Sequence, residues 1–321
     1  MSSALPGARL DELDTPALLI DLDRLEANIG RTQAFAAARG WKLRPHTKTH
    51  KIPPIAHRQL TAGAAGITVA KTGEAEVMAA AGITDIFIAN QVVGPLKLRR
   101  LAALAREIRL AVGVDHPVQA RALSEAFRHE SQPLAVLIEV DTGAQRAGVP
   151  PGEPARQLAG EIAALPGLEL RGIYTHEGQD YAAATLDELS EIAHSAQTAM
   201  VETAALLEAD LGRPCWVSIG STPSLSAGAK ALSIDRRESG LLGRPGHGAI
   251  VGHLDLQITG LSDEHAVIRG AGASRRLTIG DRVRIIPNHV CPTVNLHDVA
   301  VGIRVDRVET VWPVAARGRT Q

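Results

Sequence analysis

The sequence predicts an α/β fold, a (β/α)8 TIM barrel followed by a C-terminal antiparallel β domain. Short apolar runs alternate with alanine-rich segments between about residues 41 and 220, a pattern typical of βαβ units around a parallel sheet. After about residue 246 the residues alternate as in strands, with Gly and Asp turns and no long helical pattern. The 321 residues, 45% of them hydrophobic, are enough to bury a barrel and a smaller domain.

Seven apolar or β-branched runs are the candidate barrel strands. Stretches such as GEAEVMAAAG and PLKLRRLAALARE separate them and carry apolar residues at helical spacing. An eighth strand near 234–245 would complete the barrel, whereas the alternative, an open doubly wound sheet, would use fewer strands. The seven runs are WKLRPHTK (41–48), AGITVA (65–70), ITDIFIAN (83–90), EIRLAVGVD (107–115), LAVLIEVD (134–141), LELRGIYTH (168–176) and CWVSIG (215–220).

The segments on either side of these runs complete the predicted organisation. TPALLIDLD indicates a further strand, and RLEANIGRTQAFAAARG indicates the helix that leads into the barrel. Near the other end, DRVRIIPNHV and DVAVGIRVDRVETVWPV alternate as strands do. We therefore expect a barrel over 17–245 and a β domain over 246–321, to which 1–16 also belong.

Composition and charge exclude several classes of function. The formal net charge of −1 supplies no basic field for nucleic acid or for an anionic membrane. No apolar run reaches the roughly 18–20 residues that cross a bilayer, and the first residues lack the features of a signal peptide. The two cysteines, Cys215 and Cys291, suit a reducing compartment. We expect a cytoplasmic protein that acts on a small molecule.

In a (β/α) barrel the catalytic residues gather at the C-terminal ends of the strands. The first expected strand ends in RPHTKTHK, where alternation places Lys48 on one face with Lys42, Arg44 and His46. One interpretation is a solvated rim of charge. The other is a catalytic lysine, which needs a neutral amine and is favoured by nearby cations that lower its pKa. The side chains that could supply this field are Arg44, His46, His50 and Lys51.

The stretch IGSTPS at the end of the seventh expected strand is a candidate phosphate site. A Gly-Ser-Thr turn after a buried strand offers backbone N–H groups and two hydroxyls, although the same letters also occur in ordinary turns. Barrels often bind phosphate with the loops after strands seven and eight. Together with a lysine on strand one, the turn suggests pyridoxal phosphate on Lys48, with its phosphate at Ser221 and Thr222.

The stretch PNHVCPTVNLHD (287–298) is a candidate metal site. Read as a strand, RIIPNHVC places His289 and Cys291 on one face, about 6–7 Å apart. An imidazole and a thiolate suit Zn²⁺, whereas the alternative is a buried cysteine beside a hydrogen-bonded histidine. Two ligands are one fewer than catalytic zinc usually has, so substrate oxygens, water, His297 or Asp298 would complete the set. For Asp298 we prefer a supporting or structural role.

Several stretches together resemble one known family. DTPALLIDLDRLEANI, LRPHTKTHK, VAKTGEAE, VDTGAQRAGV, RGIYTHEG, VSIGSTPS, GLSDEH, PNHVCPTVNLHD and VWPVAARG occur in the order found in the D-serine dehydratase-like and D-threonine aldolase family. These are fold-type III pyridoxal-phosphate enzymes, similar to alanine racemase in architecture. The resemblance runs from about residue 13 to 318, which is nearly the whole chain.

The resemblance implies a role for each candidate residue. Lys48 would carry the cofactor covalently, and Arg146 would lie near its phenolic oxygen. The β domain would bind the metal, most plausibly Zn²⁺ with Mn²⁺ or Mg²⁺ as alternatives, and a partner subunit would help close the site of a homodimer. The remaining residues are Tyr174 and His176 at the cofactor ring and substrate, Gly220, Ser221 and Thr222 at the phosphate, and His289 and Cys291 at the metal.

The resemblance implies a lyase that acts on D-β-hydroxy amino acids. Aldolases of this family tend to carry aspartate at the second metal position, whereas the dehydratases carry cysteine, so Cys291 favours a dehydratase that converts D-serine to pyruvate and ammonia. The alternative is an aldolase that cleaves D-threonine or D-3-hydroxyaspartate to glycine and an aldehyde. Residues 246–321 and their metal pair argue against a non-catalytic pyridoxal-phosphate carrier. A metal-dependent barrel enzyme without an organic cofactor is the remaining alternative.

One stretch departs from the family. Related chains usually have an aromatic residue soon after RPG, whereas this chain reads GRPGHGAIVGHLDLQ, with His247 and Gly248 at that place. The departure leaves the preferred substrate side chain and part of the subunit contact open.

Overall fold

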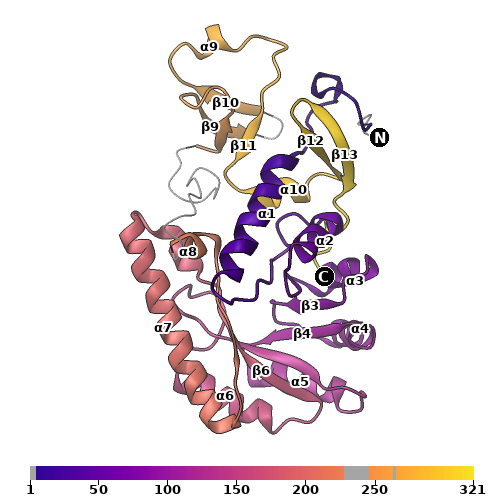
Figure 1. Cartoon of the computed structure of the whole chain (residues 1–321), viewed down its shortest axis with the longest axis vertical. Coiled ribbons are helices and arrows are strands. Elements are labelled where there is room, and N and C mark those ends of the chain that lie inside the picture. Colours follow the sequence, from indigo (N-terminus) through magenta and orange to yellow (C-terminus); the bar gives the residue numbers. More distant parts are fainter. Residues whose placement is uncertain (1–4, 228–245, 263–264) are drawn as a thin grey trace. The chain divides into compact units, whose positions relative to one another are not determined.

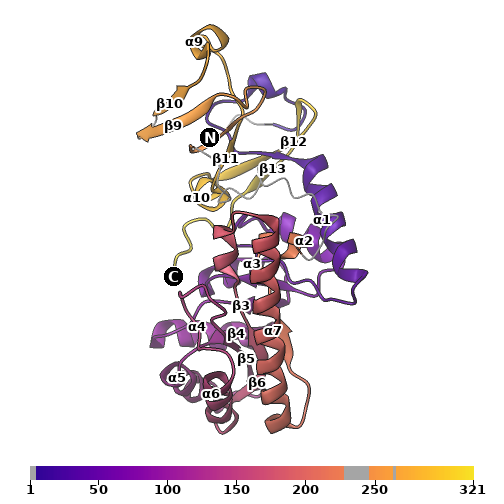
Figure 2. The same cartoon turned by 90° about the vertical axis from the view of Figure 1, so that its left-hand side faces the viewer.

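The computed structural model describes residues 5–227, 246–262 and 265–321, and the chain divides into two compact units. The larger unit comprises 1–176, 197–219 and 294–321, and the smaller unit comprises 177–196 and 220–293. Figures 1 and 2 label their helices and strands in two perpendicular views. Among the described residues, no helix is long and apolar enough to cross a membrane.

The larger unit is built on a parallel six-stranded sheet in the order β2-β3-β4-β5-β6-β7. Each strand pairs in parallel with the next along the chain, and helices alternate with the strands as in βαβ units. The strands are β2 (Ile67–Val69), β3 (Asp85–Ile88), β4 (Arg109–Val114), β5 (Leu134–Glu139), β6 (Leu168–Tyr174) and β7 (Trp216–Ser218). The helices are α2 (Pro53–Thr61), α3 (Thr72–Ala80), α4 (Pro95–Ala105), α5 (Pro117–Phe127), α6 (Glu153–Ala163) and α7 (Leu186–Leu211), of which the last continues from the smaller unit.

The main core lies between this sheet and its helices. Figure 2 shows these helices alongside the sheet. The strands contribute Val69, Ile86 and Val112, and the helices contribute Met78, Leu101 and other apolar side chains that are fully buried. A small cluster of Phe87, Leu137 and Tyr174 packs separately, as expected if alternate strand residues point to the other face.

One expected barrel strand differs from the prediction. The run 41–48 forms no regular strand, but the His46–Thr68 bridge joins it to the sheet edge beside β2, and the Ala65 amide also donates to the Leu43 carbonyl at 2.9 Å. Pro45 explains part of the difference, because proline has no N–H to donate to a ladder. The strand expected near 234–245 lies outside the described residues. The described sheet is thus a parallel half-barrel, in keeping with a TIM-like domain.

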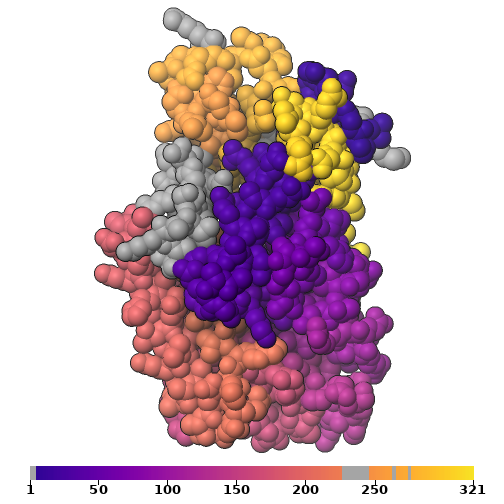
Figure 3. Space-filling view, viewed as in Figure 1, coloured from indigo at the N-terminus to yellow at the C-terminus, as the bar shows by residue number. Residues whose placement is uncertain are grey.

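A second sheet of the larger unit joins the two ends of the chain. Its order is β1-β12-β13, from β1 (Leu19–Asp21), β12 (Val299–Arg304) and β13 (Arg307–Pro313), with β1 parallel to β12. The short helix η1 (Leu10–Glu12) precedes β1 and α1 (Leu22–Ala37) follows it. Arg304 of β12 pairs with Asp23 and Glu26 of α1, and the indigo and yellow ends of the chain lie side by side in Figure 3.

The smaller unit contains the antiparallel sheet that the sequence predicts after residue 246. Its order is β10-β9-β8-β11, with β8 (Gly248–Ile250), β9 (Gln257–Ser262), β10 (His265–Arg269) and β11 (Ile285–Pro287). The helices are η2 (Gly178–Ala182), α8 (Thr222–Ala227), α9 (Ala273–Arg276) and α10 (Val290–Asn295), of which the last ends in the larger unit. Ile250, Leu256 and Ile258 form its buried core.

The compact units do not follow the expected boundaries at 245/246. Residues 294–321 belong to the larger unit because β12 pairs with β1 and because the Ala316 and Gly73 amides bond to the Lys51 and Gln321 carbonyls. Residues 177–196 belong to the smaller unit. The expected division into a barrel over 17–245 and a β domain over 246–321 with 1–16 stays a prediction.

Candidate active site

The loop that carries Lys48 is held by its own backbone and by one buried carboxylate. The Thr47 amide donates to the Thr68 carbonyl at 2.8 Å, and the Lys48 amide donates to Nδ1 of His46 at 3.2 Å. Lys51 adopts a left-handed backbone with φ 56°, and its ammonium lies 2.5 Å from Oε1 of Glu74. The other Glu74 oxygen accepts the Ala70 amide at 2.8 Å, so this carboxylate ties the loop to the end of β2.

The histidines of this loop are neutral. Burial, with the nearby charges of Lys48 and His176 next in size, holds the pKa of His46 well below its ordinary value. Burial likewise lowers the pKa of His50 to about 4. Neutral His46 can accept the Lys48 amide through Nδ1, as observed.

The positive field around Lys48 is therefore much weaker than the sequence predicted from its four basic neighbours. His46 and His50 carry no charge near pH 7, and Glu74 balances the ammonium of Lys51. The Arg44 guanidinium lies 2.6 Å from Oδ1 of Asp85, packed so close to Gly66 that a side chain there would clash with it. Sequence could not reveal these partners, because they come from other strands and helices.

Tyr174 lies at the end of β6 with its hydroxyl held inside the sheet. The hydroxyl lies 2.5 Å from the Ala89 carbonyl and 2.8 Å from Oε2 of Glu139. Burial first, and the charge of Glu139 second, raise the pKa of Tyr174 well above its ordinary value, so the phenol stays protonated. A methyl group on Gly113 would come 2.1 Å from the hydroxyl, which shows why this strand position needs glycine.

Glu139 connects three of the candidate groups. Besides Tyr174, it accepts a short hydrogen bond from the Gln91 amide, and its Oε1 lies 3.8 Å from the Arg146 guanidinium. The carboxylate is buried, whereas the Arg146 side chain is 59% exposed and extends from the loop after β5. Oδ1 of Asp141 shapes that loop by accepting the amides of Gly143 and Gln145. Glu139 was not predicted, although its place as the last residue of an apolar strand was a usable signal.

His176 lies two residues beyond the end of β6, in the larger unit. Its charge contributes to the low pKa of His46, so these two imidazoles and Lys48 lie in one neighbourhood. Thr175 fixes the chain beside it, with its amide donating to the Ser218 carbonyl at 2.9 Å and its hydroxyl 2.9 Å from that of Thr142. The structure thus brings Lys48, His46 and His176 together, and separately gathers Tyr174, Glu139 and Arg146.

The predicted phosphate turn lies in the smaller unit, where two buried acids of the segment 177–180 accept hydrogen bonds from it. The Ser221 hydroxyl bonds to Asp180, and the Ser224 amide donates to the same Asp180 oxygen at 3.0 Å. The Ser224 hydroxyl donates to Glu177 at 2.6 Å. Burial raises the pKa of Glu177 to about 7 and raises that of Asp180 as well. Gly220 and Thr222 flank Ser221 in this turn.

The segment with His289 and Cys291 differs from the predicted strand. Strand β11 ends at Pro287 and helix α10 begins at Val290, so the two side chains do not alternate on one strand face. Pro292 explains the change, because proline fits the first turn of a helix and cannot donate to a strand ladder. Among the described residues, no group of three or more His, Cys, Asp or Glu side chains is placed to hold a metal ion.

Neighbouring residues nevertheless anchor this segment. The Asn288 side chain donates to the Gly246 carbonyl at 2.6 Å, which joins the chain before His289 to the start of β8. The charge of Cys291 contributes to a raised pKa of Tyr181, after burial and Asp180, so this phenol is near the thiol. Asp298 pairs with Arg317 at 2.6 Å in the larger unit, which fits the structural role preferred for it.

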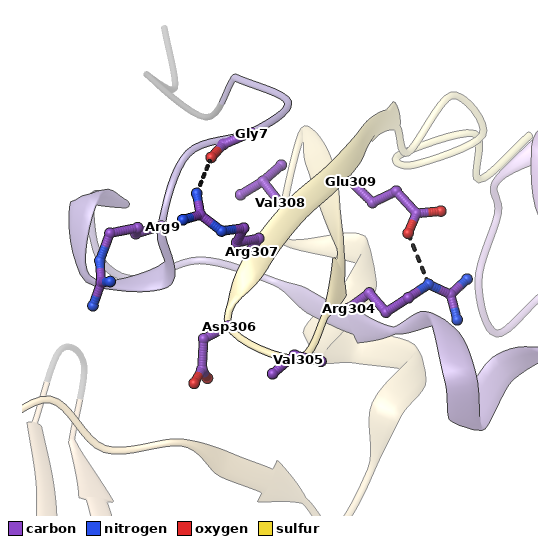
Figure 4. A pocket seen from close by; sticks show the side chains of 8 residues that line it. All are labelled: Gly7, Arg9, Arg304, Val305, Asp306, Arg307, Val308 and Glu309. Atoms are coloured by element: carbon purple, nitrogen blue, oxygen red, sulfur yellow. Dashed lines mark hydrogen bonds and ion pairs between the residues drawn. The ribbon is translucent and has the colours of Figure 1, made fainter.

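A separate hollow of about 430 Å³ lies between the N-terminal segment and the β12–β13 hairpin. Figure 4 shows its lining, in which Arg304 pairs with Glu309 and the Arg307 guanidinium bonds to the Gly7 carbonyl. None of the predicted catalytic, cofactor or metal residues lines it. This hollow is therefore not the candidate active site.

The fold and the lysine loop place the chain in a class, the proteins that share the N-terminal domain of alanine racemase. The alanine racemase N-terminal domain matches residues 20–249, and a putative serine dehydratase domain matches 220–303. The chain belongs to this fold-type III family and, within it, to the branch of D-threonine aldolase and D-3-hydroxyaspartate aldolases and dehydratase.

Individual relatives support this membership over nearly the whole chain. D-threonine aldolase of Arthrobacter sp is 32% identical over 98% of this chain and 96% of its own length. D-threo-3-hydroxyaspartate dehydratase of Delftia sp. is 33% identical over 88% and 92%. D-serine dehydratase of Schizosaccharomyces pombe is 27% identical over 68% and 55%. The crystal structure of D-threonine aldolase from Filomicrobium marinum has a TM-score of 0.88 at 32% identity, covering 99% of this chain and all of its own.

The alignments also show that this chain is the shorter one. The alignment with the Arthrobacter aldolase spans 371 positions, against 321 residues here, so about 50 positions or more of that relative have no counterpart. Histidine and cysteine variants of the Delftia dehydratase have been crystallised, the cysteine variant in a metal-free form, and the two substituted positions are two apart.

Proposed function

We propose that the protein is a pyridoxal-phosphate- and metal-dependent lyase of D-β-hydroxy amino acids that removes water from its substrate. The observation that carries the choice of reaction is the thiol of Cys291, two positions after His289. In the Delftia dehydratase, the histidine and cysteine named in the crystal structures have the same spacing, and the cysteine variant is metal-free. D-serine, with pyruvate and ammonia as products, remains the first substrate that we propose, and D-threo-3-hydroxyaspartate is the second.

The residues of the larger unit fit pyridoxal phosphate. In the lysine loop, the Glu74 carboxylate pairs with the Lys51 ammonium at 2.5 Å. Beside Lys48, His46 is neutral and does not add a positive charge to the amine's surroundings. The bound cofactor would supply an electron sink for negative charge that develops at the substrate Cα.

The chain's own groups would then divide the work. The Lys48 amine would take the Cα proton. The hydrogen bonds that the Thr47 and Lys48 backbone amides donate would hold the loop in place. Arg146 would face the phenolic oxygen of the cofactor, and Glu139 would limit where its guanidinium can lie. Tyr174 keeps its proton and would act through packing and hydrogen bonding, since its hydroxyl is already held by Ala89 and Glu139.

The smaller unit would bind the phosphate and the metal. The donors of Ser221 and Ser224 already bind a carboxylate oxygen, so this turn has the chemistry to bind an anionic oxygen. His289 and Cys291 form a donor pair suited to Zn²⁺, with Mn²⁺ or Mg²⁺ as alternatives. A divalent ion there would supply a Lewis acid for the leaving hydroxyl. The same proposal includes a closed eight-stranded barrel, a homodimer and a cytoplasmic location.

Product analysis tests the reaction. Purified protein with pyridoxal phosphate and Zn²⁺ is incubated with D-serine, D-threonine and D-threo-3-hydroxyaspartate, and the products are measured by mass spectrometry. A keto acid and ammonia are expected, and glycine with an aldehyde would refute the choice of elimination. Borohydride reduction followed by peptide mapping tests the cofactor, with the label expected on Lys48. Lys51→Ala serves as the matched control, since it removes a lysine three positions away.

A second candidate function is retro-aldol cleavage of a D-β-hydroxy amino acid to glycine and an aldehyde. The 32% identity to a D-threonine aldolase over 98% of this chain favours it. The two reactions differ in which substrate bond breaks, so the same product analysis distinguishes them.

A further inference from the structure

The Ser221–Ser224 turn already binds an anionic group of its own chain. The Ser221 hydroxyl and the Ser224 amide both donate to Oδ2 of Asp180, the amide at 3.0 Å. Two donors that converge on one carboxylate oxygen are arranged as they would be around a bound phosphate oxygen. The Asp180 carboxylate therefore occupies the donors of this turn, to which the proposed function assigns another anion, the phosphate of the cofactor.

A second acid binds the next donor of the turn. The Ser224 hydroxyl donates to Oε2 of Glu177 at 2.6 Å, and it also accepts the Ser221 amide at 3.2 Å. The two carboxyl groups thus hold three of the donors that a phosphate would use, so a phosphate must compete with both.

The two acids are placed so that their charge is costly. Glu177 and Asp180 are 1% and 0% exposed, and each has one oxygen that is buried without a hydrogen-bond partner among the described residues. A buried carboxylate with an unsatisfied oxygen loses hydration that nothing replaces. Burial raises the pKa of both acids, and the charge of Asp180 adds to the effect on Glu177.

We propose that Asp180 is an internal competitor for the phosphate subsite, and that anion binding at the Ser221–Ser224 turn requires Asp180 to become neutral. This inference rests on the proposed function in taking the turn as the phosphate subsite. When the carboxyl group gains a proton, its negative charge no longer repels the anion, and the Ser221 hydroxyl is free to donate to a phosphate. Proton uptake by the enzyme would thereby be coupled to cofactor binding.

The direction of the pH effect follows from which groups lie here. Within the described part of the smaller unit, the titratable groups at the turn are Asp180 and Glu177, with Tyr181 next to Asp180 on η2. Tyr181 keeps its proton because burial raises its pKa. The two acids lose charge as the pH falls, so a dianion should bind more tightly at lower pH.

Sulfate titration of the full-length protein tests the inference. Sulfate keeps its two negative charges over this range, so a change in affinity between ~pH 8.5 and ~pH 6 reports on the protein's own groups. Calorimetry would compare the wild type with Asp180→Asn, which keeps the shape and cannot ionise. Asp187→Asn, an exposed change near the start of α7, is the matched control.

We expect Asp180→Asn to bind sulfate at least about tenfold more tightly than the wild type at ~pH 8.5, which corresponds to about 1.4 kcal/mol. The control should match the wild type. Adding Ser221→Ala to Asp180→Asn should remove most of the gain, because the hydroxyl is then missing. Equal or weaker binding by Asp180→Asn, or no sulfate binding by either protein, would overturn the inference.

Two further measurements keep the result interpretable. If Asp180→Asn does not fold, Asp180→Ala replaces it in the same comparison, because it also removes the carboxylate from the turn. The borohydride label on Lys48 reports separately on the proposed function. If sulfate binds as expected but Lys48 carries no label, the cofactor assignment is refuted and the competition by Asp180 stands. If Lys48 is labelled but Asp180→Asn does not change sulfate binding, the cofactor assignment stands and the competition by Asp180 is refuted.

Discussion

The Lys51–Glu74 pair gives a sharp test of how the loop of Lys48 is held. Both side chains are largely buried, at 12% and 4% exposed, and the atoms that pair are 2.5 Å apart. Glu74→Gln removes the negative charge and leaves the ammonium of Lys51 without a counter-charge. Breaking a buried pair in this way typically costs about 3–5 kcal/mol. Because some exposure remains, we expect about 2–4 kcal/mol.

A matched control lies two residues away on the same helix. Glu76 pairs with Arg100 at 2.6 Å, but these side chains are 38% and 32% exposed. A partly exposed pair typically contributes about 0.2–1 kcal/mol, and the two 2.6 Å bonds of this pair place it at the upper end, so Glu76→Gln should cost about 1 kcal/mol. The two variants make the same chemical change on one helix and differ mainly in burial.

Urea unfolding measured by circular dichroism would compare the two variants with the wild type. The double variant Lys51→Met/Glu74→Gln should recover part of the loss, because it removes the unpaired ammonium. The reasoning would be refuted if Glu74→Gln and Glu76→Gln cost the same, or if Glu74→Gln changed the free energy of unfolding by less than about 0.5 kcal/mol.

Three other predictions follow from the candidate site. Gly113→Ala should destabilise the protein by about 1–3 kcal/mol in urea unfolding, because the new methyl group would lie 2.1 Å from the Tyr174 hydroxyl, 2.8 Å from its ring Cζ and 2.7 Å from the Ala89 carbonyl oxygen. Tyr174→Phe removes only the first of these contacts, so the double variant should recover only part of the loss. An unchanged free energy of unfolding in Gly113→Ala would contradict the predicted clash. The pKa of Glu177 rises from 4.5 to about 7 in the folded state, so folding takes up a proton between these pH values and the free energy of unfolding should fall as the pH rises from about 5 to 8. Glu177→Gln should flatten this pH dependence, and an unchanged slope in the variant would contradict the prediction. Cys291→Ala should reduce bound zinc, measured by mass spectrometry, and abolish ammonia release while the visible cofactor absorbance remains; full ammonia release would contradict the metal assignment.

The sequence by itself predicted the larger features of the fold. The alternation of apolar runs and alanine-rich segments placed β2 to β7 within a few residues, because the strands and helices of a βαβ unit have different periods of hydrophobic residues. The change of pattern after residue 246 predicted the antiparallel sheet. The ordered motifs indicated the family, which the match over 20–249 confirms. Local regularity and short motifs are properties of neighbours in the chain, so they are visible in sequence.

The strand predicted over 284–291 is confirmed only over β11, which ends at Pro287, and the reason is local as well. Alternation in RIIPNHVC outweighed the CP dipeptide in our interpretation, although Pro292 fits the first turn of α10 better than a ladder. The strand predicted over 41–48 reduces to a single bridge at His46 for a related reason, since Pro45 lacks an N–H.

Only the tertiary structure decided which basic side chains are charged and unbalanced, and which hydrogen-bond donors already have an acceptor. Lys48, His46 and Lys51 look alike in sequence as a basic run, yet burial makes the histidine neutral and Glu74 neutralises one lysine. Nothing in the letters of THEGQDY and GSTPS shows that Asp180 binds the serine turn. Burial and contacts between distant segments set these protonation states, because the energy of a charge depends on what surrounds it after folding.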